Sequence, residues 1–350
     1  MIAPEPLLTL PHAVAGVMVF SLHAYVLLAG ADFGGGVWDL LASGPRRDLQ
    51  RSAVADAIGP IWEANHVWLI LVIVLLFTCF PRAYAHLSTA LHVPITLMLI
   101  GIVLRGSAFT FRSYDSKADS VQRRWGRVFA MSSVATPVLL GVCLGAVASG
   151  NVPIVPRDAT RTFAELYLLP WLNAFTLSVG VLTLALFAHL AAVYLAWESS
   201  DAELRNDFRE RAMHAAVCVF IAGTLTIVFA RDNAPLVYEG LTSGRVALGM
   251  HLVTAIAGLG GIVSLWRRRW LAAVIAAAAQ ASFLVWGWAW SQFPWMVPPS
   301  HTITELAAPR ITQQLVLGVL GVGTVILLPS FVYLFRVFKR RETAFERLNS

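Results

Sequence analysis

Ionisable side chains inside long apolar runs are the first residues of this sequence that could do chemistry. Asp32 lies in the first apolar run, Glu63 lies at the start of the second, and Arg105 lies within the third. A charged group inside a bilayer is costly and usually serves a function or a specific pairing. Carboxylates bridged by water could form a route for proton entry. Alternatively, Asp32 and Arg105 could form one buried ion pair that only fixes helix packing.

Glycines surround Asp32 in the stretch GADFGGGVWDLL. Gly30 and Gly34 are four residues apart, a spacing that lets a neighbouring helix approach closely within a membrane. Gly34, Gly35 and Gly36 are also expected to loosen the helix beside Asp32, because glycine is conformationally permissive. A phosphate-binding loop is improbable, because no strand precedes the stretch and its setting is membranous.

A polar and aromatic cluster accompanies Glu63 at the start of the second apolar run. Its other members are Trp62, Asn65, His66 and Trp68. Trp62 and His66 are four residues apart and therefore share a face of the predicted helix. A haem would need axial ligands that face a cavity, and the spacing of the histidines identifies no facing pair. We therefore expect ordinary buried or interfacial histidines at each position that falls on an apolar run: His23, His66, His92, His189, His214 and His251.

The composition indicates a membrane protein. Of the 350 residues, 57% are hydrophobic and 13% are charged, and the mean hydropathy is +0.69. Soluble domains are typically about 25% charged. The cysteines, Cys79, Cys143 and Cys218, fit no metal-binding spacing and imply no disulfide. We predict an all-α, polytopic membrane protein that forms a single integral membrane domain over residues 1–350, with no soluble domain.

Nine apolar runs are long enough to cross a bilayer, which takes about 20 residues. The runs are 12–42, 60–80, 86–111, 126–148, 164–197, 212–230, 246–266, 270–291 and 312–338. The first and fifth exceed one bilayer thickness, so they must tilt or project into water. The first run has no basic residue before it and no small-residue cleavage site after it. It is therefore expected to stay as a spanning helix rather than to be removed as a signal peptide.

The basic residues predict the orientation of these spans. With the N-terminus outside, 19 of the 26 Lys and Arg residues lie in cytoplasmic segments and six lie in outer segments. Because cytoplasmic loops are rich in Lys and Arg, we predict an outside N-terminus and a cytoplasmic C-terminus. The net charge of +6 then reflects topology and does not indicate nucleic-acid binding. In this orientation Asp32, Glu63 and Arg105 lie in the cytoplasmic half, and Asp39 is an ordinary residue of the inner interface.

Five sequence blocks resemble subunit II of the cytochrome bd-type quinol oxidases. In chain order they are GADFGGGVWDLL, IGPIWEANHVWLILVIVLLFTCFPRAYA, LRGSAFTFRSYDSK, WGRVFAMSSVATPVLLGVCLGAVASGN and QFPWMVPPS. They occur in the order found in the family and together cover most of the chain. The nine predicted spans and the outside N-terminus are also similar to those of the family.

The resemblance implies a haem-free subunit that binds no cofactor tightly. Its partner in a heterodimer, subunit I, would hold two haems b, one haem d and the quinol-oxidising loop. The complex would reduce O₂ to water with electrons from quinol, taking protons from the cytoplasm, in the bacterial cytoplasmic (inner) membrane. A small single-span accessory subunit, membrane lipid, and a lipid or quinone bound to this chain are further candidates.

The resemblance also implies roles for individual residues. Asp32 matches the family's carboxylate among glycines, and Glu63 matches a position that holds Asp in some members. Both are candidates for a proton path, with Arg105 as their charge partner. His66 replaces a Gln of some members, which argues against a haem role for it. Two alternatives stay open: a secondary transporter, which would favour inverted repeats and broken helices, and a purely structural partner of subunit I.

Overall fold

The computed structural model describes residues 9–58, 62–114, 119–153 and 162–348. Within these ranges, some side chains are not described: those of residues 58, 62–64, 112–114, 119–123, 327–328, 331–332 and 334–348. Trp62 and Glu63 therefore belong to a described helix, but their side chains lie outside the described residues.

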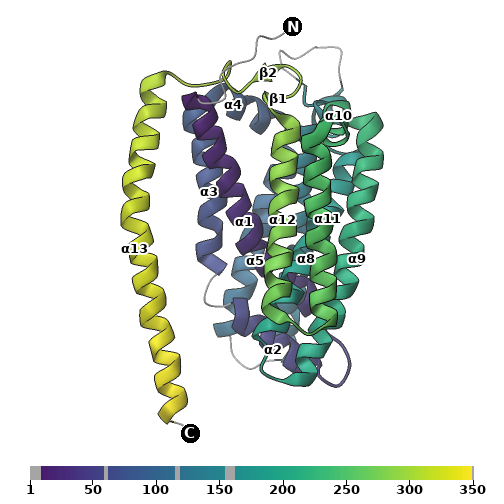
Figure 1. The fold of residues 1–350 in the computed structure, drawn as a ribbon, viewed down its shortest axis with the longest axis vertical. Coiled ribbons are helices and arrows are strands. Elements are labelled where there is room, and N and C mark those ends of the chain that lie inside the picture. Colours follow the sequence, from purple (N-terminus) through teal and green to yellow (C-terminus); the bar gives the residue numbers. More distant parts are fainter. Residues whose placement is uncertain (1–8, 59–61, 115–118, 154–161, 349–350) are drawn as a thin grey trace.

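Long helices run side by side between the two ends of the molecule (Figure 1). They are α1 (Leu10–Leu40), α3 (Trp62–Cys79), α5 (His92–Tyr114), α6 (Asp119–Ser149), α8 (Ala174–Glu198), α9 (Ala202–Asn233), α11 (Gly244–Trp266), α12 (Trp270–Gln292) and α13 (Arg310–Leu348). Each is rich in apolar residues, and the core lies where α1, α6 and α8 pack together. The predicted all-α class is confirmed.

Short elements cover the two ends of this bundle (Figure 1). One end carries α2 (Arg47–Ile58), and we call it the basic end. The opposite end carries α4 (Pro81–Ala90), α10 (Pro235–Thr242) and two short antiparallel strands, β1 (Trp295–Val297) and β2 (His301–Thr302). A further short helix, α7 (Phe163–Tyr167), precedes α8. Helix α1 begins at the end that carries α4, and α13 ends at the level of the basic end.

The described helices include seven that are long and apolar enough to cross a membrane: α1, α5, α6, α8, α9, α11 and α12. Helices α3 and α4 pass the same test only as a pair, and they are bent by 118° at the break between them. The described apolar part of α13 is Arg310–Ile326, which is shorter than a full span. A polytopic membrane protein is confirmed, whereas the count of nine spans and their orientation stay predictions.

The predicted span 86–111 has a different start in the structure. The chain turns at Leu91, and only α5 continues across the bundle. The residues before the turn form α4, which begins at Pro81. Proline favours the first turn of a helix because its missing N–H needs no partner there. The predicted run began within α4 and continued past Leu91, so the sequence did not locate the break.

The predicted span 164–197 is divided into α7 and α8. The side chain of Asn173 accepts a hydrogen bond from the backbone N–H of Thr176 at 3.0 Å, and the Thr176 hydroxyl in turn pairs with the backbone N–H of Asn173. This reciprocal capping starts a new helix at Ala174. The expectation of one long helix is therefore wrong.

Helix α1 continues without interruption through its glycines, so the expected loosening beside Asp32 is wrong. A Cβ atom at Gly34 would overlap the backbone carbonyl of Phe187 in α8, and one at Gly36 would overlap Ser133 in α6. A Cβ at Gly30 would lie 2.9 Å from the Phe187 ring. The missing side chains thus let two neighbouring helices press against α1, and these contacts hold it helical.

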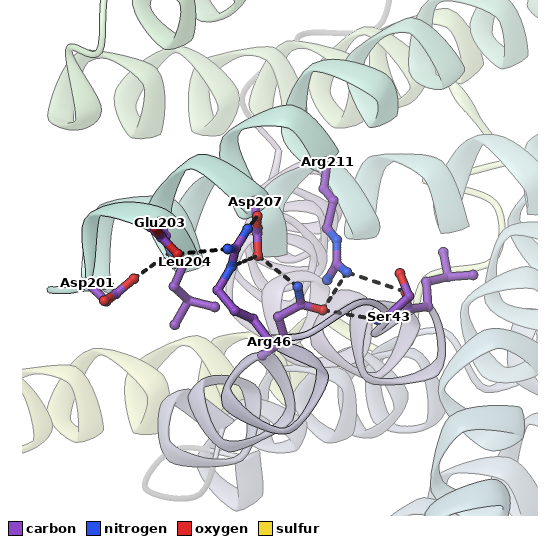
Figure 2. Close-up of polar contacts among 9 residues, drawn as sticks. Ser43, Arg46, Asp201, Glu203, Leu204, Asp207 and Arg211 are labelled. Carbon is purple, nitrogen blue, oxygen red and sulfur yellow. Dashed lines mark hydrogen bonds and ion pairs between the residues drawn. The ribbon is translucent and has the colours of Figure 1, made fainter.

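A polar cluster joins the loop after α1 to the start of α9 at the basic end (Figure 2). The Arg46 guanidinium donates to both carboxylate oxygens of Asp207, at 2.8 and 2.6 Å, and to Glu203 at 2.8 Å. The Gln50 amide donates to Asp207 at 2.8 Å and accepts from Arg211 at 2.7 Å. The cluster therefore fastens α2 and its connecting loop to α9.

We expect Asp207→Asn to lower thermal stability more than Glu203→Gln. The Asp207 side chain is 18% exposed and accepts from two residues, whereas the Glu203 side chain is 73% exposed. Loss of hydrogen bonds to a partly buried carboxylate should cost roughly 1–3 kcal/mol. Loss of an exposed pair should cost about 1 kcal/mol or less. Thermal unfolding of the two purified variant complexes measures the difference, and equal midpoints would contradict the prediction.

Candidate functional site

A buried ion pair between Asp32 of α1 and Arg105 of α5 forms the centre of the site. The guanidinium donates to the two carboxylate oxygens at 2.6 and 3.0 Å, a bidentate geometry. It also donates to the Asp32 carbonyl oxygen at 3.1 Å and, through Nε, to the Ser133 hydroxyl of α6 at 3.1 Å. Both charged residues are at most 2% exposed. The pair therefore joins three helices.

Two aromatic rings flank the guanidinium. The Cζ atom of Arg105 lies 4.6 Å from the ring centroid of Phe33 and 5.0 Å from that of Phe129. Cation–π attraction is strongest for such desolvated groups. The Ser133 hydroxyl donates to the Phe129 carbonyl at 2.7 Å, so it can accept from Arg105. These contacts hold Arg105, and through it Asp32, in one orientation.

A cavity of about 170 Å³ lies beside Asp32, between α1, α2 and α8. Its wall includes Gly35 and is mostly apolar, and its polar members are Asp32, Tyr194 and Glu198. Glu198 is the exposed last residue of α8, at the basic end. The residues that line the cavity thus run from buried Asp32 to exposed Glu198 at the basic end. Its wall has no His or Met that could ligate a haem iron, so these residues do not fit a haem.

The first described side chains of α3 pack against α1. The Asn65 amide is buried and donates to the Leu28 carbonyl oxygen at 3.4 Å. The Trp68 ring meets the Phe20 ring edge-on, with centroids 6.1 Å apart. Two of the predicted supporting residues therefore anchor α3 on the helix that carries Asp32.

His66 lies one turn after Glu63 and on the same face of α3 as that residue. Its ring centroid is 6.0 Å from that of Tyr25 and 5.9 Å from that of Phe33, both of α1. Because Phe33 also packs on the Arg105 guanidinium, His66 stands in the second layer around the ion pair. Of the described members of the predicted cluster, His66 thus reaches the surroundings of the ion pair, whereas Asn65 and Trp68 contact α1 at Leu28 and Phe20.

Asp39 is buried, although it was expected to be an ordinary interface residue. It is 2% exposed. The Nε atom of Arg51 in α2 lies 3.9 Å from its carboxylate and donates to its carbonyl oxygen at 3.3 Å. Helix α2 folds back on the end of α1, which removes Asp39 from water.

Three residues of the site gave no functional signal in the sequence. Phe129, Ser133 and Tyr194 are apolar or weakly polar residues within apolar runs, where such residue types occur throughout. Only the approach of α6 and α8 to α1 reveals their contacts. The basic-end carboxylate Glu198 was also missed, because an exposed charge at the end of a helix is common.

Several described histidines are engaged in hydrogen bonds with other groups. Nδ1 of His189 pairs with the Ala212 carbonyl at 3.0 Å, and Nε2 of His251 pairs with the Leu241 carbonyl at 2.8 Å. Within the described part of the chain, no group of three or more His, Cys, Asp or Glu could hold a metal ion. His189 and His251 thus each use one ring nitrogen to bond a backbone carbonyl.

Comparisons with known proteins identify the relatives of this chain. A sequence model of the family described as cytochrome bd terminal oxidase subunit II matches residues 10–338. The chain is 25% identical over 332 residues to cytochrome bd ubiquinol oxidase subunit 2 of Bacillus subtilis (strain 168), covering 91% of this chain and 92% of that protein. It is 28% identical over 208 residues to cytochrome bd-I ubiquinol oxidase subunit 2 of Escherichia coli (strain K12), covering 58% and 53%.

A solved structure has a similar fold. It is the bd oxidase from Geobacillus thermodenitrificans, with a TM-score of 0.79 and 20% sequence identity. The match covers 95% of this chain and 99% of the matched chain. At this identity the likeness shows the fold alone.

Proposed function

The chain belongs to the cytochrome bd terminal oxidase subunit II family, and from this premise we propose how its own residues serve the oxidase. As a member it is a multi-pass bacterial membrane protein and a subunit of a quinol oxidase complex, an oxidoreductase. We propose that the complex lies in the cytoplasmic membrane and that subunit I holds two haems b and one haem d. The family favours this role over that of a secondary transporter.

We propose that this subunit helps to deliver protons from the basic end, through Glu63 and Asp32. Reduction of O₂ to water, the chemistry that the haems of the partner supply, consumes protons. The observation that carries the proposal is the cavity that extends from buried Asp32 to exposed Glu198. Its volume has room for roughly five waters at about 30 Å³ each.

The Asp32–Arg105 pair would give this route a fixed negative group. Arg105 holds the carboxylate with two N–H donors, so Asp32 is oriented without being freely hydrated. Glu63 lies in the first turn of α3 and would exchange protons with water.

Subunit I is the partner that the family implies, and further partners are proposed by class. Helices α11 and α13 expose large apolar side chains, among them Ile256, Val319 and Val325. Helix α13 stands to one side of the other helices (Figure 1). Such faces suit membrane lipid, subunit I or a small single-span accessory subunit. We also propose that the apolar exterior can hold a lipid or a quinone.

We expect Asp32→Asn and Glu63→Gln each to lower quinol-driven O₂ consumption. The loss should be about tenfold or more, because positioned proton-transfer groups contribute about 10²- to 10⁴-fold in enzymes. The measurement is the turnover of the purified complex, per haem. Glu203→Gln is the matched control, because it removes an exposed carboxylate at the same end. Unchanged turnover with a normal haem spectrum would leave subunit II a purely structural role.

A further inference from the structure

We propose that His66 is a proton-carrying residue between Glu63 and the Asp32–Arg105 pair; the proposal rests on the function proposed above. Among the described residues, the buried Nδ1 atom of His66 has no hydrogen-bond partner. Buried polar atoms are nearly always hydrogen-bonded to protein or water. An unpaired imidazole nitrogen inside the bundle is therefore free to take up or release a proton.

The groups around His66 support this assignment. Asp32 of α1 and Arg105 of α5 both act on it electrostatically, and the Tyr25 ring of α1 packs against it. On its own helix, Glu63 precedes it by three residues, so both belong to one face of α3. His66 thus follows Glu63 along α3 and reaches the charged pair through the Phe33 ring, which contacts both.

The chemistry requires only that N–H bonds form and break. A proton arriving from the Glu63 carboxyl group, directly or through water, adds to one ring nitrogen and gives an imidazolium. The proton on either nitrogen then leaves toward Asp32, which restores the neutral ring. Two opposite charges act on the ring, the carboxylate of Asp32 and the guanidinium of Arg105. An imidazole titrates near neutral pH, which suits a relay of this kind.

The test substitutes His66→Gln in the complete oxidase. The glutamine side chain keeps the polarity and removes the titration. We expect quinol-driven O₂ consumption to fall about tenfold, less than the ~10²-fold that loss of a general acid or base often costs, because water can partly replace the ring. We also expect the pH profile of turnover to change, because a glutamine side chain does not titrate. His23→Gln is the matched control, because His23 already pairs with the Ser282 hydroxyl at 2.7 Å, and its profile should match that of the wild type.

Unchanged turnover and an unchanged pH profile in His66→Gln, with normal haem content, would overturn the proposal. The Asp32→Asn and Glu63→Gln variants distinguish failure of the His66 proposal from failure of the proposed proton route. If they lose turnover and His66→Gln does not, only the role of His66 fails; if none loses turnover, the proton route itself fails. If His66→Gln does not assemble, proton uptake by the reduced wild-type oxidase on reaction with O₂ decides. An uptake rate that is constant across the imidazole titration overturns the proposal.

Discussion

Substitution Gly34→Ala is expected to reduce sharply the yield of assembled, haem-containing oxidase. A Cβ at this position would overlap the carbonyl carbon and oxygen of Phe187 in α8. These are backbone atoms, so the contact can be relieved only by moving one helix away from the other. Overpacking a core usually lowers the free energy of unfolding by about 1–3 kcal/mol. Because the clashing atoms belong to the backbone, we expect a loss at the upper end of this range. The measurement is the amount of complex purified from membranes, together with its thermal unfolding midpoint.

Gly16→Ala provides the control within the same helix. A Cβ at Gly16 would meet no atom within 4 Å. Because Ala is a better helix former than Gly by about 1 kcal/mol, this variant should assemble normally. Equal yields of the two alanine variants would contradict the close approach of α1 and α8.

Which stretches of the chain form long helices could be predicted from the sequence better than the residues at which each helix begins and ends. Hydropathy locates a span because about 20 consecutive apolar residues are needed to cross a bilayer. It did not locate the turn at Leu91 between α4 and α5. The limits depend on local chemistry instead. Pro81 opens one helix and the Asn173 cap opens another.

Part of the candidate site could also be predicted from the sequence, for a different reason. Charged residues are rare in apolar runs, so Asp32 and Arg105 could be named as partners although 73 residues separate them. In the basic-end loops charges are common, and nothing in their spacing indicated that Arg46 would pair with Asp207. The cavity was also beyond prediction, because it depends on how α2 and α8 pack against α1.

Arg105→Met should cause the largest loss of stability among the substitutions of charged residues. It leaves the Asp32 carboxylate buried without its partner, and breaking a buried pair from one side typically costs about 3–5 kcal/mol. Exposed Arg245→Met, on α11, is the matched control and should be close to neutral. Yield and thermal unfolding of the purified complex measure both variants. A stable Arg105→Met complex would show that Asp32 is hydrated or protonated in the folded protein.

The double variant Asp32→Asn with Arg105→Met then separates anchoring from proton transfer. It removes both charges, so its loss of stability should be smaller than the sum of the two single losses, by about 1–3 kcal/mol for residues in contact. If Asp32 carries protons, the double variant regains yield but not quinol-driven turnover, since the titratable group is still missing. If turnover returns together with yield, Asp32 serves only to hold Arg105. The two outcomes differ in activity at similar stability, so the experiment distinguishes a proton path from a packing role within one set of proteins.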